Sequence, residues 1–558
     1  MKAIPQRVNV SLWWLVNRNI FLFSFLVGTW LAIAYPPFPL AFLIFTGFIP
    51  LFALVEYRYY PRQISFRRLW LTFYLTFLFW NFFTCYWLML TALWVGDLQE
   101  AILAFAAGLV ANIANALLQT LPLLLYTFVR QSTTSLFASF TFIFFWLGFE
   151  YLHFNWELSW SWLTLGHAFT FYPIYIQFVE FTGVLGVSLL VLLINVLLWQ
   201  GIVRQRGQQL YWIVAWVLLL VPLVLSPILT NPRRQVFQKV GTIKVRIVQP
   251  NIDPYAKFNQ LSDEAQVYSF IEQMKSKSLE GVDLVILPET ALPFYLEEGY
   301  AMQHSLVYPL LELCARQKCS ILTGAVALRF YNHCDSIPAS AKVYLDASGK
   351  KYCYETYNAA TTIFAGSPGI IYKKAKLVPF TERTPFLEEI FLLKGWEIDL
   401  GGGFGSFGYP DSIFSLALHN GVQVAPVICY ESQFGDYVRH LFLKGAQLGC
   451  IITNDGWFGN SSGYIQHAYL ATLRAIENRR EFARCANTGM SLFVDSKGYV
   501  YQKLGWWKKG VIDRELNLYQ TKTFYMTHGD YIGKYSVIIA IVLLLSVFVR
   551  SKLRLHYK

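Results

Sequence analysis

Long apolar runs dominate two parts of the chain, residues 1–231 and 536–549, whereas residues 232–535 mix polar and apolar positions as a water-exposed domain does. A helix needs about 20 mainly apolar residues to cross about 30 Å of hydrocarbon. Eight runs approach or exceed this length, at residues 19–36, 38–55, 69–94, 101–129, 136–152, 171–200, 210–230 and 536–549. The pattern predicts a membrane domain of seven spans at 1–231, an extramembrane domain at 232–535, and an eighth span with a basic tail at 536–558.

The extramembrane domain alternates short apolar strands with helical segments. A helix is expected to begin at Asp263, which forms a capping box with Gln266. Strands are expected at 243–252, 282–287, 320–328, 360–364, 422–429 and 448–453, with further helices at 305–317 and 464–484. Strands alternating with helices predict a layered α/β domain, in which reactive groups tend to lie at the C-terminal ends of strands.

The composition agrees with a membrane protein. The chain of 558 residues is 55% hydrophobic and only 14% charged, whereas soluble proteins have about a quarter charged residues. This excludes an ordinary soluble protein, a disordered chain and a small disulfide scaffold. The net charge of +12 does not call for nucleic acid, because the basic residues of the membrane part lie in loops that would face anionic lipid headgroups.

Basic loop residues predict the orientation in the membrane. If the N-terminus is cytoplasmic, the loops around 97–100 and 155–157 lie outside and carry no lysine or arginine. Because positive loops stay inside, we expect both termini in the cytoplasm and the domain at 232–535 outside it. The basic residues that then face the cytoplasm are Lys2, Arg7, Arg18, Arg58, Arg62, Arg67, Arg68, Arg130, Arg204, Arg206, Arg550, Lys552, Arg554 and Lys558.

The eight cysteines include no Cys-x-x-Cys pair and no Cys/His spacing typical of zinc. We therefore expect no metal site. An extracytoplasmic domain permits disulfides, and Cys334 with Cys353 is one candidate pair among several connectivities that the sequence leaves open.

Three residues near strand ends could act together. Glu289 and Cys429 each close an apolar strand, and Lys374 lies between strands. A carboxylate, an ammonium and a thiol that converge would provide a base, a cation that lowers the thiol pKa and stabilises an oxyanion, and a nucleophile. Each residue alone is more often structural, as a core cysteine, a capping acid or a solvated lysine.

The order and surroundings of these residues resemble the apolipoprotein N-acyltransferase family of the nitrilase superfamily. The similar segments are Leu287–Pro293, Tyr372–Glu382, Val427–Glu431, Asn454–Gly459 followed by His467, and Trp162–Gly166. The resemblance covers nearly the whole chain, including the plan of eight spans. It implies a polytopic α-helical membrane domain joined to a nitrilase-like α/β domain of the αββα type.

The resemblance also implies roles for single residues and requires no cofactor. Glu289 matches the general base, Lys374 the lysine that stabilises the oxyanion, and Cys429 the nucleophile. Four more positions match supporting residues of the family: Glu382, Asn358, Tyr430 and Glu431. Trp162 and Trp457 match positions that the family associates with substrate access, and ordinary aromatic packing is the alternative for each.

The expected reaction is transfer of a fatty acyl chain from a phospholipid to the N-terminal amine of a diacylglyceryl-cysteine apolipoprotein, through a cysteine thioester. This is the last step of lipoprotein maturation and places the chain in the bacterial cytoplasmic (inner) membrane. We expect a monomer, because the membrane domain would obstruct the assembly that soluble relatives form. Two alternatives remain: a membrane-anchored amidase that hydrolyses a small amide, and a lipid-binding scaffold without activity.

Several positions depart from the family pattern. Lys376 replaces a histidine, Thr381 replaces a glycine, and Phe258 stands where the family often has a tryptophan. If Lys376 were buried beside Lys374, its charge would lower the pKa of Lys374. The glycines at 401–403 resemble a flexible loop over the site, for which a lid and an ordinary solvated loop are both open.

Overall fold

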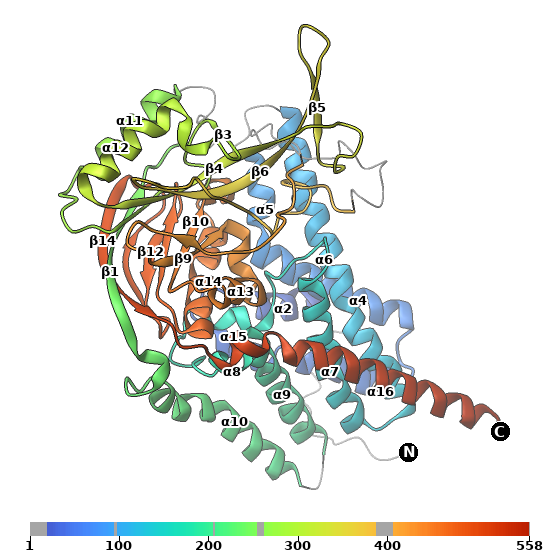
Figure 1. Ribbon diagram of the computed structural model, residues 1–558. Helices are drawn as coiled ribbons and strands as arrows, with labels where there is room; N and C mark the ends of the chain where they lie inside the picture. The colour runs from blue at the N-terminus through green and yellow to red at the C-terminus, as the bar shows by residue number, and fades with distance from the viewer. Residues whose placement is uncertain (1–18, 94–97, 205–206, 254–261, 387–405, 557–558) are drawn as a thin grey trace. The chain divides into compact units, whose positions relative to one another are not determined.

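The computed structural model describes residues 19–93, 98–204, 207–253, 262–386 and 406–556 (Figure 1). The chain divides into two compact units. The helical unit comprises residues 1–88, 106–230 and 530–558, and the α/β unit comprises residues 89–105 and 231–529.

Helices account for most of the helical unit. A 3₁₀ turn at Ala41–Thr46 and a π turn at Val55–Tyr59 flank α3, and α6 continues from one unit into the other. The helices are α2 (Ile20–Ala32), α3 (Ile49–Leu54), α4 (Phe66–Cys85), α5 (Trp87–Leu90), α6 (Leu98–Ser132), α7 (Ser135–Phe154), α8 (Val179–Thr182), α9 (Val184–Val203), α10 (Gln208–Leu229) and α16 (Tyr531–His556).

Fewer helices than predicted are long enough to be spans by themselves. Within the described residues, six helices are long and apolar enough to cross a membrane, and up to seven if the pair at 66–93, bent by 54°, is one span. The first predicted span is the 13-residue helix α2, because the prolines at 36, 37 and 39 cannot continue a helix. The sixth begins only at Val184, because Gly183 with φ +61° ends α8 and interrupts the apolar run.

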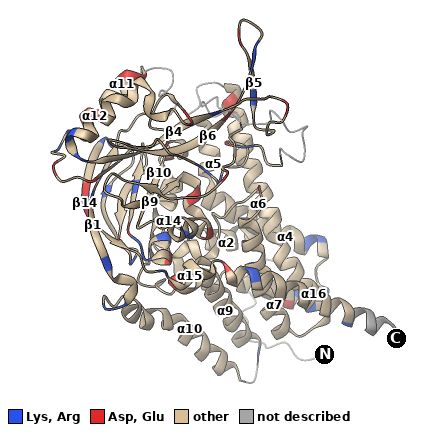
Figure 2. Cartoon of the chain, viewed as in Figure 1, with Lys and Arg blue, Asp and Glu red and all other residues tan. Residues whose placement is uncertain are grey.

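Contacts within the helical unit join loops that the charge pattern assigns to the same membrane side. Arg130, after the fourth predicted span, lies 2.6 Å from the carboxylate of Glu56, after the second. Between two loops assigned to the opposite membrane side, the Tyr172 hydroxyl donates to the Pro39 carbonyl at 2.7 Å. The helices α9 and α10 contain no charged residue, as expected for membrane spans (Figure 2). The loop contacts agree with an alternating path of the helices through the unit.

Two sheets form the centre of the α/β unit. The larger sheet has the order β14-β1-β2-β4-β6-β5, with β3 paired to β4 and β7 to β6. Its strands are β1 (Lys239–Gln249), β2 (Leu284–Ile286), β3 (Tyr295–Glu297), β4 (Ser320–Tyr331), β5 (Lys342–Leu345), β6 (Lys351–Ile363), β7 (Ile371–Lys373) and β14 (Gly510–Tyr519). The smaller sheet has the order β13-β12-β11-β10-β9-β8. Its strands are β8 (Leu416–Ala417), β9 (Gln423–Ile428), β10 (Leu448–Thr453), β11 (Phe482–Ala486), β12 (Ser491–Val494) and β13 (Val500–Leu504).

The sheets face each other and helices cover their outer faces (Figure 1). The Cys485 thiol on β11 donates to the Val248 carbonyl on β1 at 3.2 Å, which joins the two sheets directly. Apolar residues of α11 (Asp263–Met274) and α12 (Tyr308–Gln317) share one core with β2 and β4 of the larger sheet. The helices α13 (Gly435–Leu443) and α14 (Ser462–Asn478) pack on the smaller sheet. This four-layer order is the αββα fold that was expected, and a short helix, α15 (Phe524–His528), precedes α16.

Two local predictions were wrong. The cap of α11 is Ser262, whose side chain accepts a hydrogen bond from the Ala265 amide, so Asp263 belongs to the first turn and not to a capping box. The helix predicted at 464–484 ends at Asn478, because Arg479 adopts φ +47°, and residues 482–486 form β11. Arginine gives no sequence signal for such a left-handed residue.

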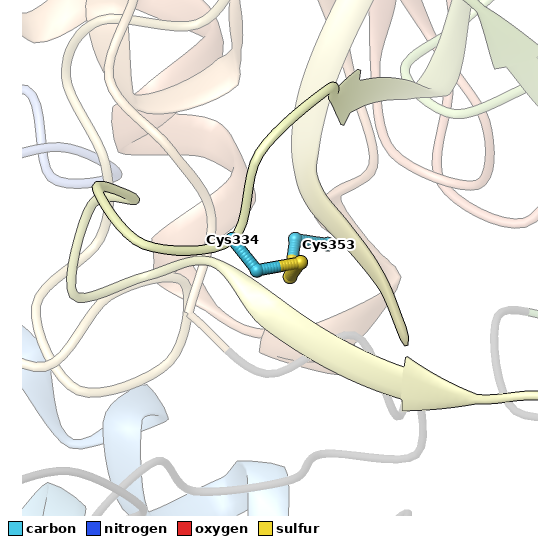
Figure 3. The surroundings of a disulfide bond; sticks show 2 residues. All are labelled: Cys334 and Cys353. Carbon is cyan, nitrogen blue, oxygen red and sulfur yellow. A yellow bond between two sulfur atoms is a disulfide. The ribbon is translucent and has the colours of Figure 1, made fainter. Parts of the chain in front are cut away.

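A disulfide joins Cys334 to Cys353 beside the β5–β6 hairpin (Figure 3). Cys353 lies on β6, where it pairs with Tyr331 of β4 and Val343 of β5. The candidate pair from the sequence is therefore formed. The bond secures the long connection between β4 and β5 at the outer end of the larger sheet.

Candidate active site

Residues from both sheets meet at one place in the α/β unit. Glu289 follows β2 and Lys374 directly follows β7 in the larger sheet, whereas Cys429 directly follows β9 in the smaller one. The Asn454 amide, just after β10 of the smaller sheet, donates to Glu289 Oε2 at 2.9 Å. This hydrogen bond crosses between the sheets, so the candidate site lies between them.

Lys374 lies between two carboxylates. Its Nζ donates to Glu382 Oε1 at 2.7 Å and to Glu289 Oε1 at 3.2 Å. The Asn358 side-chain amide, on β6, donates to the same two oxygens, each at 2.8 Å. The second carboxylate oxygen of Glu382, Oε2, accepts a hydrogen bond from the Val378 amide at 2.8 Å. Every contact brings a donor to a carboxylate oxygen, as an ionised glutamate requires.

Lys374 is 1% exposed, yet it remains charged. Burial alone would lower the pKa of Lys374, but the negative charges of Glu289 and Glu382 outweigh burial and hold this pKa well above its ordinary value. A buried charge is tolerated when it is paired and hydrogen-bonded in this way. The site therefore holds a fixed ammonium group.

The neighbouring Lys376 is not the buried second positive charge that the sequence raised as a possibility. Lys376 is only half-buried, and its ammonium lies 4.8 Å from the centre of the Phe434 ring. The lowering of the Lys374 pKa was expected only for a buried Lys376, so this condition is not met, and the pKa of Lys374 is raised. The position tolerates lysine by directing it toward an aromatic face, a favourable contact for a cation.

Cys429 holds a protonated thiol at rest. Burial, and next the charge of Glu289, raise the pKa of this thiol, and the charge of Lys374 only partly opposes them. The sequence led us to expect an ammonium that lowers the thiol pKa, and here the other two effects are larger. A thiol of this kind needs a base at the moment of attack.

The backbone on both sides of the site is strained. Cys429 has φ +50° and Thr290, directly after Glu289, has φ +45°, which is unfavourable for residues other than glycine. Gly324 on β4 packs closely against the turn at Glu289 and Thr290. A Cβ atom at position 324 would lie 2.4 Å from the Thr290 amide nitrogen, so only glycine fits there. Such strain commonly marks functional sites, where the surrounding fold imposes the geometry.

Glu431 ties the cysteine turn to the lysine segment. Its carboxylate accepts hydrogen bonds from the Ile428 amide and the Ala375 amide, each at 2.7 Å, and from the Tyr372 hydroxyl at 3.0 Å. Burial raises the pKa of Glu431 to about 7. The adjacent Tyr430 is buried, with its ring 5.1 Å from that of Phe434. Both residues therefore support the turn that carries Cys429.

The two tryptophans singled out in the sequence lie in different units. Trp162 is buried in the helical unit, with its ring centre 4.5 Å from that of Trp87. Trp457 lies in a 3₁₀ turn of the α/β unit, Asp455–Phe458, after β10. Phe258 and the glycines at 401–403 lie outside the described residues.

One contributor to the site could not be found from side-chain type. Asn454 binds Glu289 through its backbone amide. Every residue except proline has such an amide, so the residue type does not reveal this contact. The only signal was its position at the end of a predicted strand, beside the segment Asn454–Gly459.

Known proteins resemble the chain along nearly its full length. The family model described as "Apolipoprotein N-acyltransferase N-terminal domain" matches residues 27–197, and the one described as "Carbon-nitrogen hydrolase" matches residues 244–525. The apolipoprotein N-acyltransferase of Chlorobaculum tepidum is 31% identical, over 96% of this chain and 98% of its own. That of Geobacter metallireducens is 31% identical over 69% of each chain, and that of Thermotoga maritima is 28% identical over 73% of this chain and 69% of its own. The chain therefore belongs to the apolipoprotein N-acyltransferase family, as a multi-pass membrane protein with a nitrilase-like α/β unit.

Proposed function

We propose that the chain is an acyltransferase that moves a fatty acyl chain from a membrane phospholipid to the N-terminal amine of a diacylglyceryl-cysteine apolipoprotein, the last step of lipoprotein maturation. One set of contacts carries this proposal: Lys374 donates to Glu289 at 3.2 Å, and Glu431 binds both the amide after Lys374 and the amide before Cys429. The chain that holds these groups is related to an apolipoprotein N-acyltransferase over 96% of its length. The residues form a base, a cation and a nucleophile.

In the first half of the reaction, Glu289 takes the proton of the Cys429 thiol as the sulfur attacks the phospholipid ester carbonyl. Lys374 and nearby backbone amides stabilise the oxyanion that forms. The ester C–O bond then breaks, Glu289 returns the proton to the leaving alcohol, and a lysophospholipid departs. An acyl thioester on Cys429 remains.

In the second half, the apolipoprotein amine attacks the thioester. Glu289 accepts a proton from the amine as the C–N bond forms, and it passes this proton to the sulfur as the C–S bond breaks, which restores the Cys429 thiol and the Glu289 carboxylate. Because a thioester is less stable than an amide, this exchange proceeds without ATP. The two halves make a ping-pong reaction with a covalent intermediate.

The supporting residues hold these groups in place. Glu382 and Asn358 fix the ammonium of Lys374 between the carboxylates. Glu431 fixes the cysteine turn through two backbone amides, and Tyr430 packs beside it. Trp162 and Trp457 would assist substrate access, each within its own unit.

The membrane setting follows from the substrates. Each buried CH₂ group contributes roughly 0.8 kcal/mol to membrane binding, so the acyl chains remain in the bilayer while the reaction proceeds at its surface. We propose that residues 232–535 work outside the cytoplasm, flanked by membrane segments at 1–231 and 536–558, with both termini cytoplasmic. The basic loops support this orientation. We also propose that the enzyme works as a monomer.

Intact mass spectrometry of the detergent-purified protein after incubation with phospholipid tests the proposal. Wild type should gain the mass of one long acyl chain in a hydroxylamine-labile bond, and Cys429→Ala should not. Cys450→Ala is the matched control, since Cys450 lies buried on the neighbouring strand β10, and it should gain the adduct. No adduct from any phospholipid class would contradict the proposed donor and favour an amidase.

A further inference from the structure

A buried polar cluster lies behind Cys429 and takes no part in the mechanism above. His467 on α14 places Nδ1 2.8 Å from Asp455 Oδ1, and its Nε2 lies 3.1 Å from the backbone carbonyl oxygen of Cys429 and 3.0 Å from Ser432 Oγ. Arg484 on β11 donates to Asp455 Oδ2 at 2.8 Å. All four side chains are buried, each 1% exposed or less. A charged cluster with no contact to water requires an explanation.

The order of these groups resembles that of a serine hydrolase, with Ser432 next to His467 and His467 next to Asp455. Ser432 is nevertheless unsuited to attack a substrate. It is 1% exposed, and its hydroxyl donates to the Cys429 carbonyl at 2.7 Å. The cluster is therefore directed at the backbone of the nucleophile, and Ser432 is a second donor to the same carbonyl.

The hydrogen bonds define where the protons lie. Asp455 accepts from Arg484 and from the Thr453 hydroxyl, so it is an ionised acceptor. Burial would raise the pKa of Asp455, but Arg484 and His467 outweigh burial and hold it well below its ordinary value. His467 Nδ1 lies 2.8 Å from this carboxylate and 3.2 Å from the Arg484 guanidinium. Nε2 faces the Cys429 carbonyl oxygen, which can only accept a hydrogen bond, so Nε2 is the donor there.

The carbonyl that this cluster binds belongs to the strained residue of the site. Cys429 has φ +50°, a conformation that persists only where the surroundings enforce it. In a trans peptide the N–H points opposite to the preceding C=O. Fixing the Cys429 carbonyl therefore also fixes the direction of the Tyr430 amide, the first backbone donor after the nucleophile.

We propose that Asp455 and His467 form a positioning pair that, with Ser432, clamps the Cys429 carbonyl and thereby fixes both the thiol and the Tyr430 amide for acyl transfer. The inference rests on the proposed role of Cys429 as nucleophile. His467 touches no substrate, so it is a positioning residue and not a catalytic one.

Two substitutions of His467 separate the clamp from simple structural support. The side-chain amide nitrogen of glutamine lies near the place of Nε2, so His467→Gln keeps a donor to the Cys429 carbonyl. The amide of asparagine lies near the place of Nδ1, so His467→Asn keeps the contact to Asp455 and loses the clamp. Both variants replace the same buried imidazole by a neutral amide, which makes each the stability control of the other.

Three readouts are measured on the full chain in detergent: the melting temperature, the rate at which iodoacetamide alkylates Cys429, and the rate of the first acylation by phospholipid. Alkylation at Cys429 is identified by intact mass against Cys429→Ala. We expect similar melting temperatures for the two variants. His467→Asn should slow acylation about a hundredfold, as a misplacement of about 1 Å can do, with a smaller loss in alkylation. His467→Gln should stay within about fivefold of wild type in both rates.

Equal rates for the two variants would overturn the clamp, whether both match wild type or both fall in step with the melting temperature. A wild-type protein that is alkylated at Cys429 but never acylated would instead overturn the proposed function. In that case the difference in alkylation rate between His467→Asn and His467→Gln still decides the clamp.

Discussion

The larger and the smaller sheet of the α/β unit both end at the site, but they bring different features to it. The larger sheet contributes side-chain charge, with Lys374 between Glu289 and Glu382. The smaller sheet contributes a thiol on strained backbone, where Cys429 has φ +50° and Glu431 accepts a hydrogen bond from the preceding Ile428 amide. The larger sheet therefore supplies the charges that act on the thiol, and the smaller sheet holds the thiol itself.

This division predicts how substitutions on the two sides will differ. Loss of a charge on the larger sheet should slow the chemical step, because the thiol then lacks its proton acceptor or a buried charge lacks its partner. Loss of a support on the smaller sheet should act through the position of the thiol. Matched variants on each side test the distinction.

The largest effect is expected for Glu289→Gln, which keeps the size of the side chain but removes the base. The rate of thioester formation should fall by about 10³-fold or more. Glu298→Gln is the control, because Glu298 pairs with Lys373 at 3.1 Å and its side chain is 40% exposed. That variant should stay within about threefold of wild type. Single-turnover mass spectrometry measures both, and a Glu289→Gln rate near that of the control would remove the base from the account.

Lys374→Met should reduce both activity and stability. Thioester formation should slow by about 10²- to 10³-fold through loss of the oxyanion partner. Unfolding should cost about 3 kcal/mol less, since two buried carboxylates lose their common cation. Lys373→Met is the neighbouring control, whose partners Glu298 and Asp411 are well exposed. Acylation rates and chemical denaturation measure these changes, and equal losses in the two variants would show that the buried pairing has no special role.

On the smaller sheet, Glu431 should give the protein a specific pH dependence. Burial raises the pKa of Glu431 from its ordinary 4.5 to about 7, so the folded state binds the proton more tightly than the unfolded state. The stabilisation is complete below about pH 4.5 and is lost as pH rises through about 7, a change of about 3 kcal/mol. Stability of wild type relative to Glu431→Gln should therefore fall across this window. Melting curves from pH 4.5 to 8 that run parallel for the two proteins would contradict this.

The smallest effect on activity is expected at the disulfide. Replacing Cys334 and Cys353 by alanine opens a connection of 19 residues and should cost up to about 3 kcal/mol in stability. Because the bond lies beside the outer hairpin and not among the site residues, turnover should stay within about twofold. Proteolysis of the hairpin and steady-state turnover measure the two effects. A strong loss of turnover at temperatures where the variant is folded would make the hairpin part of the site.

The residues of the larger sheet were the easier ones to predict from the sequence. Glu289 and Lys374 are charged residues beside short apolar strands, and their resemblance to a known family located them together. The layered α/β class also follows from pattern, because strands that alternate with helices favour layered sheets. The structure adds the distances and the finding that Asn358, already named from the resemblance, donates to both carboxylates.

On the smaller sheet the resemblance named Tyr430 and Glu431, but contacts made through backbone atoms were harder to predict. His467 contacts Cys429 from 38 positions away in the sequence, through a backbone carbonyl. The Asn454 amide reaches Glu289 across the two sheets. Contacts of this kind depend on tertiary packing and on backbone atoms, which residue types do not reveal. The left-handed turn at Arg479 and the interruption at Gly183 escaped prediction for the same reason.

The proposed reaction depends most on an acyl-enzyme that passes its acyl chain to an amine. Wild-type protein should be loaded with phospholipid, freed of excess lipid, and then mixed with a lipopeptide that carries an N-terminal diacylglyceryl-cysteine. We expect the mass adduct on Cys429 to disappear at the same rate as N-acylated lipopeptide appears, in equal amounts. Decay of the adduct to free fatty acid at a rate that the lipopeptide does not change would contradict the account and identify a hydrolase.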